Sequence, residues 1–126
     1  MWKKKTKVNF KDERGEIRDL LTKTTVDAIT LITCKKGSVR GNHYHKKTVQ
    51  YDYVISGKFA CYTKPMPNGK IQKRILLGGD IAFHPAMEAH TFLALEDTVF
   101  ISITKGPRNG ADYEKDTIRL DKPLNK

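Results

Sequence analysis

The sequence predicts an all-β fold, because short runs of β-branched and aromatic residues recur along the chain and turn residues separate them. The clearest run covers residues 28–34 and is followed by a turn at Gly37. A second run, residues 49–55, is closed by Gly57, and a third covers residues 98–104. Strands separated by turn signals every 8–12 residues or so are typical of a β-sandwich or a β-barrel.

Five further segments have the same character but are shorter or less apolar. These predicted strands cover residues 16–21, 59–63, 70–77, 81–83 and 90–95. No segment has a capped helical period, apart from a helical turn near residues 111–115. The chain has 126 residues and neither a repeat nor a low-complexity linker, so we expect one all-β domain spanning residues 1–126.

Composition narrows the cellular setting. Hydrophobic residues make up 38% of the chain, and no apolar run approaches the ~20 residues that a membrane span needs. The basic start is not followed by an apolar segment, so we expect no secretory signal and a cytoplasmic location. Cys34 and Cys61 lie inside predicted strands and are expected to be reduced, inert thiols of the core.

The charge balance favours an anionic partner. The chain has 24 Lys and Arg against 14 Asp and Glu, a net charge of +10. An excess of lysine and arginine can also exist only to keep a protein soluble, without any anionic partner. The one dense basic run, residues 3–7, lacks any nucleic-acid-binding motif. A phosphorylated small molecule is therefore a better candidate than nucleic acid.

Two histidines stand at strand spacing. His43 and His45 are two residues apart, so on a strand their side chains share one face. If both point inward, each imidazole needs a partner, which implies a polar cavity or a metal ion. A third histidine, His90, comes from a distant part of the chain.

The spacing of these histidines resembles the two motifs of the cupin superfamily. The first motif matches Gly37, His43, His45 and Gly57 over residues 37–57, with Gln50 where the superfamily has Glu. The second motif, residues 79–94, matches in its glycine, proline and histidine; its departures are Met87 for Gly and Ala94 for Asn. The resemblance implies a double-stranded β-helix, or jelly-roll barrel, with a pocket between its sheets.

The whole chain looks more closely like cupins that act on nucleotide-linked sugars. Residues 10–15, 39–44 and 43–47 resemble segments of the dTDP-4-keto-6-deoxysugar 3,5-epimerases and 3,4-ketoisomerases, and the tail 105–120 resembles their closing region. The resemblance implies isomerisation or epimerisation of a nucleotide-diphosphate sugar in polysaccharide or glycan synthesis, without a cofactor. It also implies a homodimer, since related barrels usually pair through edge strands. Trp2 is a candidate for that interface.

The resemblance also assigns roles within the site. His43 is the expected base and His45 its partner, while Arg40, or a lysine such as Lys46 or Lys47, holds the diphosphate. The residues expected to shape the substrate pocket are Gln50, Tyr51, Tyr53 and His90. The epimerases carry a tyrosine on the last core strand, which residues 100–104 lack. That departure disfavours 3,5-epimerisation and leaves a 3,4-ketoisomerase, a one-site epimerase or an undefined relative.

A metal-dependent cupin is the alternative. His43, His45 and His90 would supply imidazoles and Gln50 an amide oxygen to Fe, Mn, Ni or Zn, as in a dioxygenase or a sugar-phosphate isomerase. A barrel that only binds a small ligand is the third possibility. Three other polar residues are expected outside the chemistry: His84 at the rim, and Asp80 and Glu88 in turns.

Overall fold

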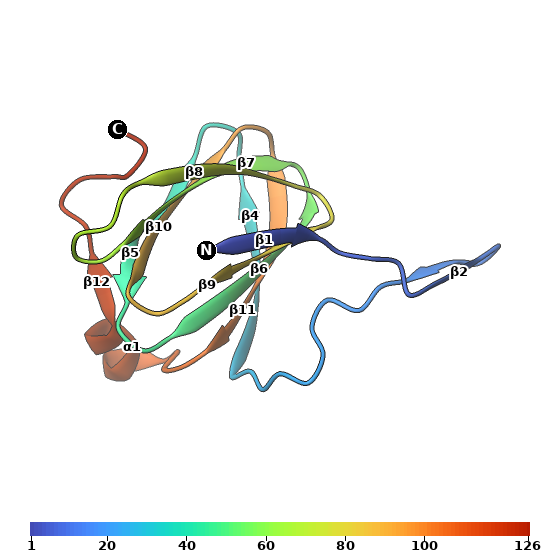
Figure 1. Cartoon of the computed structure of the whole chain (residues 1–126), viewed down its shortest axis with the longest axis horizontal. Coiled ribbons are helices and arrows are strands. Elements are labelled where there is room, and N and C mark those ends of the chain that lie inside the picture. Colours follow the sequence, from blue (N-terminus) through green and yellow to red (C-terminus); the bar gives the residue numbers. More distant parts are fainter.

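Two five-stranded antiparallel sheets face each other in the computed structural model, which describes residues 1–126 (Figure 1). The first sheet has the order β1 (Trp2–Lys5), β9 (Asp80–His84), β6 (Val49–Ser56), β11 (Thr98–Lys105), β4 (Ala28–Cys34). The second has the order β12 (Thr117–Arg119), β5 (Val39–His45), β10 (Glu88–Ala94), β7 (Lys58–Pro65), β8 (Gln72–Leu77). The predicted jelly-roll barrel is confirmed.

Alternation along each strand decides which side chains enter the barrel. On β6, Gln50, Asp52 and Val54 are buried, while Tyr51 and Tyr53 between them are half-buried and face the outside. The strands β4 and β11 alternate in the same way. The interior therefore receives every second residue of each strand, polar ones included.

The apolar core fills one part of the barrel. Phe59, Phe92 and Phe100 come from three strands, and their ring centroids lie 5.2–5.8 Å apart. Val54 and Leu76 complete the packing without any exposed surface. Further along the same strands the inward residues become polar: His90 follows on β10 and Ser102 on β11. The barrel is thus packed in one part and hollow in the other.

Two elements lie outside the sheets. A hairpin of β2 (Phe10–Asp12) and β3 (Gly15–Ile17) projects away from the barrel, and the helix α1 (Gly110–Asp116) lies beside the end of β5 (Figure 1). The helix appears where a helical turn was expected. The predicted strand 16–21 is shortened to Gly15–Ile17, and β1, β2, β5 and β12 were not among the predicted strands.

Two further expectations can be compared with the structure. Cys34 and Cys61 are both buried and unpaired, as predicted. The helix α1 has seven residues, far fewer than the ~20 that a membrane-spanning helix needs.

Candidate functional site

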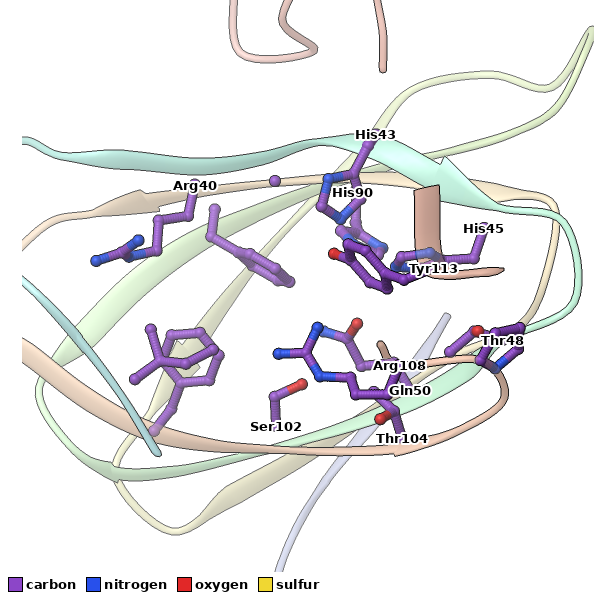
Figure 2. A pocket seen from close by; sticks show the side chains of 15 residues that line it. Arg40, His43, His45, Thr48, Gln50, His90, Ser102, Thr104, Arg108 and Tyr113 are labelled. Atoms are coloured by element: carbon purple, nitrogen blue, oxygen red, sulfur yellow. The ribbon is translucent and has the colours of Figure 1, made fainter. Parts of the chain in front are cut away.

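Three histidines converge inside the hollow part of the barrel. His43 and His45 come from the end of β5, and His90 comes from β10, where it pairs in register with His43. The His43 ring centroid lies 4.9 Å from that of His45 and 4.8 Å from that of His90 (Figure 2). One ring nitrogen from each of the three lies within 4.8 Å of the others.

A bulge in β5 lies next to the paired residues His43 and His90. The β5–β10 register shifts between His90 and Thr91, and on β5 the bulge places Gly41 and Asn42 at positive φ. A Cβ atom on Gly41 would lie 2.7 Å from the carbonyl oxygen of His90, so only glycine permits this close approach. Asn42 Oδ1 accepts a hydrogen bond from Thr91 Oγ1 at 2.6 Å, which holds the bulge closed.

All three imidazoles are neutral at pH 7. Burial lowers the pKa of His43 to about 4, with smaller contributions from the Arg119 guanidinium and, where it is protonated, His45. Burial also lowers the pKa of His45 and, more strongly, that of His90. Neutral imidazoles can accept a proton or coordinate a metal ion, and charged ones can do neither.

The orientation of His45 is fixed from outside the cavity. Its Nδ1 lies 3.2 Å from Thr117 Oγ1 and 3.6 Å from Asp116 Oδ2. Asp116 also accepts hydrogen bonds from the backbone of Lys47 and from the Thr48 hydroxyl, so the carboxylate is itself held in place. A proton on Nδ1 facing Asp116 leaves the Nε2 lone pair of His45 available to the cavity.

The opposite wall of the cavity carries an amide and hydroxyl groups. Gln50 of β6 and Ser102 and Thr104 of β11 face the histidines across the cavity (Figure 2). Arg108 and Tyr113, from the segment after β11, also line it, with the guanidinium 5.1 Å from the centroid of the tyrosine ring. The cavity volume is about 230 Å³.

Several polar atoms of this cavity have no protein partner. Both ring nitrogens of His90 and the hydroxyl of Thr104 are buried without a hydrogen bond. Buried polar groups are nearly always hydrogen-bonded, and unsatisfied ones call for a ligand, an ion or water. The cavity is therefore chemically suited to bind a ligand, an ion or water.

A buried charged cluster lies behind the wall. Gln50 Nε2 donates to both carboxylate oxygens of Asp52, and Asp52 Oδ2 lies 3.1 Å from His84 Nε2. Glu88 Oε1 is 3.8 Å from the other nitrogen of His84. Burial alone would lower the pKa of His84, but the carboxylates of Asp52 and Glu88 beside it outweigh burial and raise that pKa.

The structure corrects three sequence expectations, two of them in this cluster. His84 does not lie at the rim: it ends β9, points inward and is 1% exposed, with its ring centroid 5.1 Å from that of His90. Glu88 begins β10 rather than lying in a turn, and it is buried beside His84. Asp80 begins β9 and is buried, with an ion pair to Lys5 at 2.8 Å.

The remaining predicted site residues fall into three groups. Arg40 lines the cavity together with Gln50 and the three histidines. Tyr51 and Tyr53 do not reach it, because they alternate with Gln50 and face outward; Tyr51 packs on Trp2 and Phe83. Lys46 and Lys47 line a separate surface cavity next to α1.

Sequence reasoning overlooked several residues of the site. Ser102 and Thr104 follow Phe100 at two-residue spacing on one strand, so alternation could have placed them in the interior. The same holds for Asp52, which follows Gln50. No comparable pattern marks Arg108 and Tyr113, which reach the cavity from a loop and a short helix.

Solved structures with this fold come from several sugar-modifying proteins. A dTDP-4-dehydrorhamnose 3,5-epimerase from Sulfolobus tokodaii is 22% identical, with a TM-score of 0.73 over 86% of this chain and 70% of that chain. QdtA, a sugar 3,4-ketoisomerase from Thermoanaerobacterium thermosaccharolyticum solved in complex with TDP, is 20% identical, with a TM-score of 0.74 over 95% of this chain and 88% of that chain. At these identities the likeness establishes the cupin fold.

A longer protein contains the same barrel. CapF, a capsular polysaccharide assembling protein from Staphylococcus aureus, is 21% identical with a TM-score of 0.69. The match covers 93% of this chain but 34% of CapF. No curated protein matches the sequence. The model of one family, the polysaccharide biosynthesis C-terminal domain, matches residues 10–103, and the chain belongs to that family.

Proposed function

We propose that this protein is an enzyme that isomerises or epimerises the sugar of a nucleotide-linked 4-keto-6-deoxysugar, in polysaccharide or glycan synthesis. The observation that carries the proposal is the neutral imidazole of His43, which lines the interior cavity of the barrel with His45 and His90. The family of the chain and the sugar-nucleotide enzymes that share its fold support the substrate class.

The chemistry needs a base beside a carbon next to a ketone. His43 takes the proton from that carbon, and the electron pair of the C–H bond moves to form an enolate. Returning a proton to the former carbonyl carbon, while the hydroxyl proton of the first carbon passes to the enolate oxygen, moves the carbonyl. Returning a proton to the first carbon from the opposite face inverts that centre. His45, 4.9 Å from His43 between ring centroids, is the second group able to carry that proton.

Size and charge agree with a sugar bound inside and a nucleotide outside. The cavity of about 230 Å³ is smaller than the roughly 300–1,000 Å³ of pockets that bury drug-sized ligands, so it suits one sugar ring. Arg40 and Arg108 line the same cavity and can bind the diphosphate. A bound diphosphate would raise the pKa of His43 towards the neutral range that suits a general base.

The opposite wall of the cavity favours ketoisomerisation or one-site epimerisation over 3,5-epimerisation. The cavity-facing residues of β11 are Phe100, Ser102 and Thr104, so this strand brings no tyrosine to the substrate. The two imidazoles of β5 lie on one wall and can serve neighbouring carbons on one face of a sugar. This arrangement supports movement of the ketone between C3 and C4.

Proton exchange tests the proposal directly. Wild-type protein is incubated in deuterated water with dTDP-, UDP- and GDP-linked 4-keto-6-deoxysugars, and deuterium at C3, C4 and C5 is followed by NMR. We expect incorporation with at least one sugar and a loss of about 100-fold or more in His43→Ala. The matched control is Tyr51→Phe, outside the cavity. A fully active His43→Ala protein would exclude His43 as the base.

A metal centre is the second candidate, favoured by the three converging imidazole nitrogens. His90 is buried with both nitrogens unpartnered, and the donation of Gln50 Nε2 to Asp52 leaves its carbonyl oxygen as the only atom available for a ligand. Three nitrogens and one oxygen fit Fe, Mn, Ni or Zn. Such an ion would act as a Lewis acid on a substrate oxygen.

Metal content separates the two candidates without any activity measurement. Tag-free protein is analysed by mass spectrometry for Fe, Mn, Ni and Zn as purified, and again after loading and gel filtration. About one tightly held ion per chain, lost in His90→Ala but retained in Tyr51→Phe, would establish a metal centre. Absence of any ion above background after loading would leave the metal-free base as the remaining candidate.

A further inference from the structure

A tyrosine enters the cavity from outside the two sheets. Tyr113 belongs to the helix α1, and its ring points from there into the cavity that the three histidines line (Figure 2). The ring centroids of Tyr113 and His45 lie 5.9 Å apart. A phenol hydroxyl keeps its proton at neutral pH and can both donate and accept a hydrogen bond. Tyr113 therefore adds a proton-bearing group beside a wall of imidazoles.

The ring of Tyr113 is held in place, but its hydroxyl is not. The Arg108 guanidinium lies 5.1 Å from the centroid of the ring, within the range of a cation–π contact. The side-chain hydrogen bonds of the surrounding segment come from Asp116, Thr117 and Arg119, and the Tyr113 hydroxyl takes part in none of them. The hydroxyl is thus available to a molecule bound in the cavity.

One short segment positions both the phenol and one of the imidazoles. Tyr113 and Asp116 are three residues apart on α1, so they lie on neighbouring positions of one helix face. The backbone N–H of Thr117 donates to the carbonyl oxygen of Tyr113, and the Thr117 side chain contacts Nδ1 of His45 at 3.2 Å. The segment that orients His45 therefore also fixes the place of Tyr113.

The proposed ketoisomerisation has to move two protons. One proton leaves one carbon and another arrives at the neighbouring carbon, and His43 serves both transfers. The second proton passes from the hydroxyl of the first carbon to the oxygen of the original ketone. This transfer needs a group that can give a proton to one oxygen and take a proton from the next.

Most polar groups of the cavity cannot perform this second transfer. Gln50 presents its carbonyl oxygen, which has no proton to give, because its NH₂ group donates to Asp52. The guanidinium groups of Arg40 and Arg108 stay protonated in proteins. Ser102 and Thr104 are alcohols, which are far weaker acids than a phenol. The phenol is the remaining group of suitable acidity.

We propose that Tyr113 is a catalytic residue that carries the hydroxyl proton between the two oxygens while His43 carries the proton between the two carbons. This inference rests on the proposed function, with the ketone moving between C4 and C3. The pairing of the two roles requires that both side chains reach the same sugar, and both line the one cavity of about 230 Å³.

The first half-reaction forms an enediol. His43 takes the proton from C3, and the electron pair of that C–H bond forms a double bond between C3 and C4. The π pair of the C4 ketone takes the proton of the Tyr113 hydroxyl, which leaves a phenolate. The Arg108 guanidinium beside the ring stabilises this transient negative charge.

The second half-reaction restores both residues. The phenolate of Tyr113 takes the proton of the 3-hydroxyl, and the electron pair of that O–H bond forms the new carbonyl at C3. The electron pair of the C3–C4 double bond takes the proton from His43 at C4. Tyr113 and His43 end as they began, and the sugar is neither oxidised nor reduced overall.

The variant Tyr113→Phe tests the role of the hydroxyl, because it keeps the ring beside Arg108 and His45 and removes only the O–H group. It is assayed in deuterated water with whichever of the dTDP-, UDP- and GDP-linked 4-keto-6-deoxysugars the wild type converts. We expect kcat for isomerisation to fall about 100-fold or more. KM should change by about threefold at most, because the lost step follows binding.

A second readout separates catalysis from a structural effect. Without the hydroxyl proton an enolate formed by His43 returns to the starting ketone, so deuterium at C3 of recovered substrate should rise relative to product. General damage to the site would lower exchange and product formation together. The matched control is Tyr62→Phe on β7, outside the cavity, where Lys73 Nζ lies 5.7 Å from the ring centroid. It should keep the wild-type kcat.

The outcomes distinguish this inference from the proposed function. A wild type that neither exchanges nor converts any of these sugars would end both. A wild type that epimerises without moving the ketone, or a Tyr113→Phe protein as active as wild type, would overturn the role of Tyr113 alone. The same holds if exchange and product formation fall equally in Tyr113→Phe. Circular dichroism and thermal unfolding establish that each variant is folded.

Discussion

The side-chain amide of Gln50 donates to both carboxylate oxygens of Asp52, at 2.9 Å and 3.0 Å, and this bifurcated contact decides which end of the amide the cavity meets. A carboxylate accepts hydrogen bonds and cannot donate them when ionised. The NH₂ group of Gln50 must therefore face Asp52, and its carbonyl oxygen faces away. The cavity meets an acceptor that carries no formal charge.

The carboxylate of Asp52 also stabilises the protonated form of its neighbour His84, so Asp52→Asn should destabilise the fold. Removing one partner of a buried ion pair typically costs about 3–5 kcal/mol, because the other charge stays buried or loses its proton. We expect a loss of that size in the free energy of unfolding, measured with urea at pH 7. The control Asp12→Asn removes an exposed pair with Arg14 and should cost far less. Equal stability of Asp52→Asn and wild type would refute the charged cluster.

The lowered pKa of His43 predicts a loss of stability in acid. Burial keeps the pKa at about 4 in the folded chain, against 6.5 in the unfolded chain. Between these values the unfolded state binds the extra proton, so stability is complete above about pH 6.5 and falls as the pH drops towards 4. We expect this residue to contribute about 2–3 kcal/mol to the difference between pH 7.5 and pH 4.5.

The measurement compares wild type with His43→Asn by urea unfolding at both pH values. The variant has no titrating group at this position, so its stability should fall by about 2–3 kcal/mol less on acidification. His45 and His90 remain in both proteins, so the difference between the two profiles reports His43 together with its electrostatic coupling to these neighbours. Parallel pH profiles for the two proteins would contradict a buried, neutral His43.

The bulge at Gly41 predicts a large effect from a single methyl group. Gly41 and Gly37 both have φ of +87°, but a Cβ on Gly41 would meet the His90 backbone whereas one on Gly37 would meet nothing within 4 Å. Gly37→Ala should cost about 1 kcal/mol, from the strained backbone alone. Gly41→Ala should cost at least about 2 kcal/mol more, since β10 must move. Chemical unfolding of both variants measures the difference, and similar losses would argue against the close approach.

Asp116 should raise the pKa of His45 from outside the cavity. Burial is the largest influence and lowers the pKa of His45, and the negative charge of Asp116 opposes it. Asp116→Asn keeps the shape and removes the charge, so we expect the pKa of His45 to fall further. NMR titration of the imidazole resonances measures it. Glu114→Gln, an exposed residue paired with Arg119, should leave His45 unchanged.

Short-range pattern explains what could be predicted from the sequence. The run at residues 28–34 coincides with β4, because β-branched and apolar residues alternate there with a clear end at the following turn. The cluster of His43, His45 and His90 was predicted from spacing and motif together, and the three rings do meet in one cavity. The homodimer and the cytoplasmic location stay predictions.

Long-range packing explains the errors. His84 stands beside a proline, which suggested a loop, yet β9 runs through it and buries it against Asp52, a residue 32 positions earlier. Tyr51 and Tyr53 were predicted to shape the substrate pocket, but alternation with Gln50 turns them outward. The strands β1 and β12 are edge strands of three or four residues, too short to produce a pattern of their own.

The β2–β3 hairpin contributes none of the side chains that fill the apolar core. Phe10 and Ile17 face each other across the hairpin and are 51% and 60% exposed. The hairpin is therefore stabilised mainly by contacts between its own two strands. An isolated hairpin of this size is only marginally stable in water. Changes of length or sequence in the hairpin should therefore leave the histidine cavity of the barrel intact.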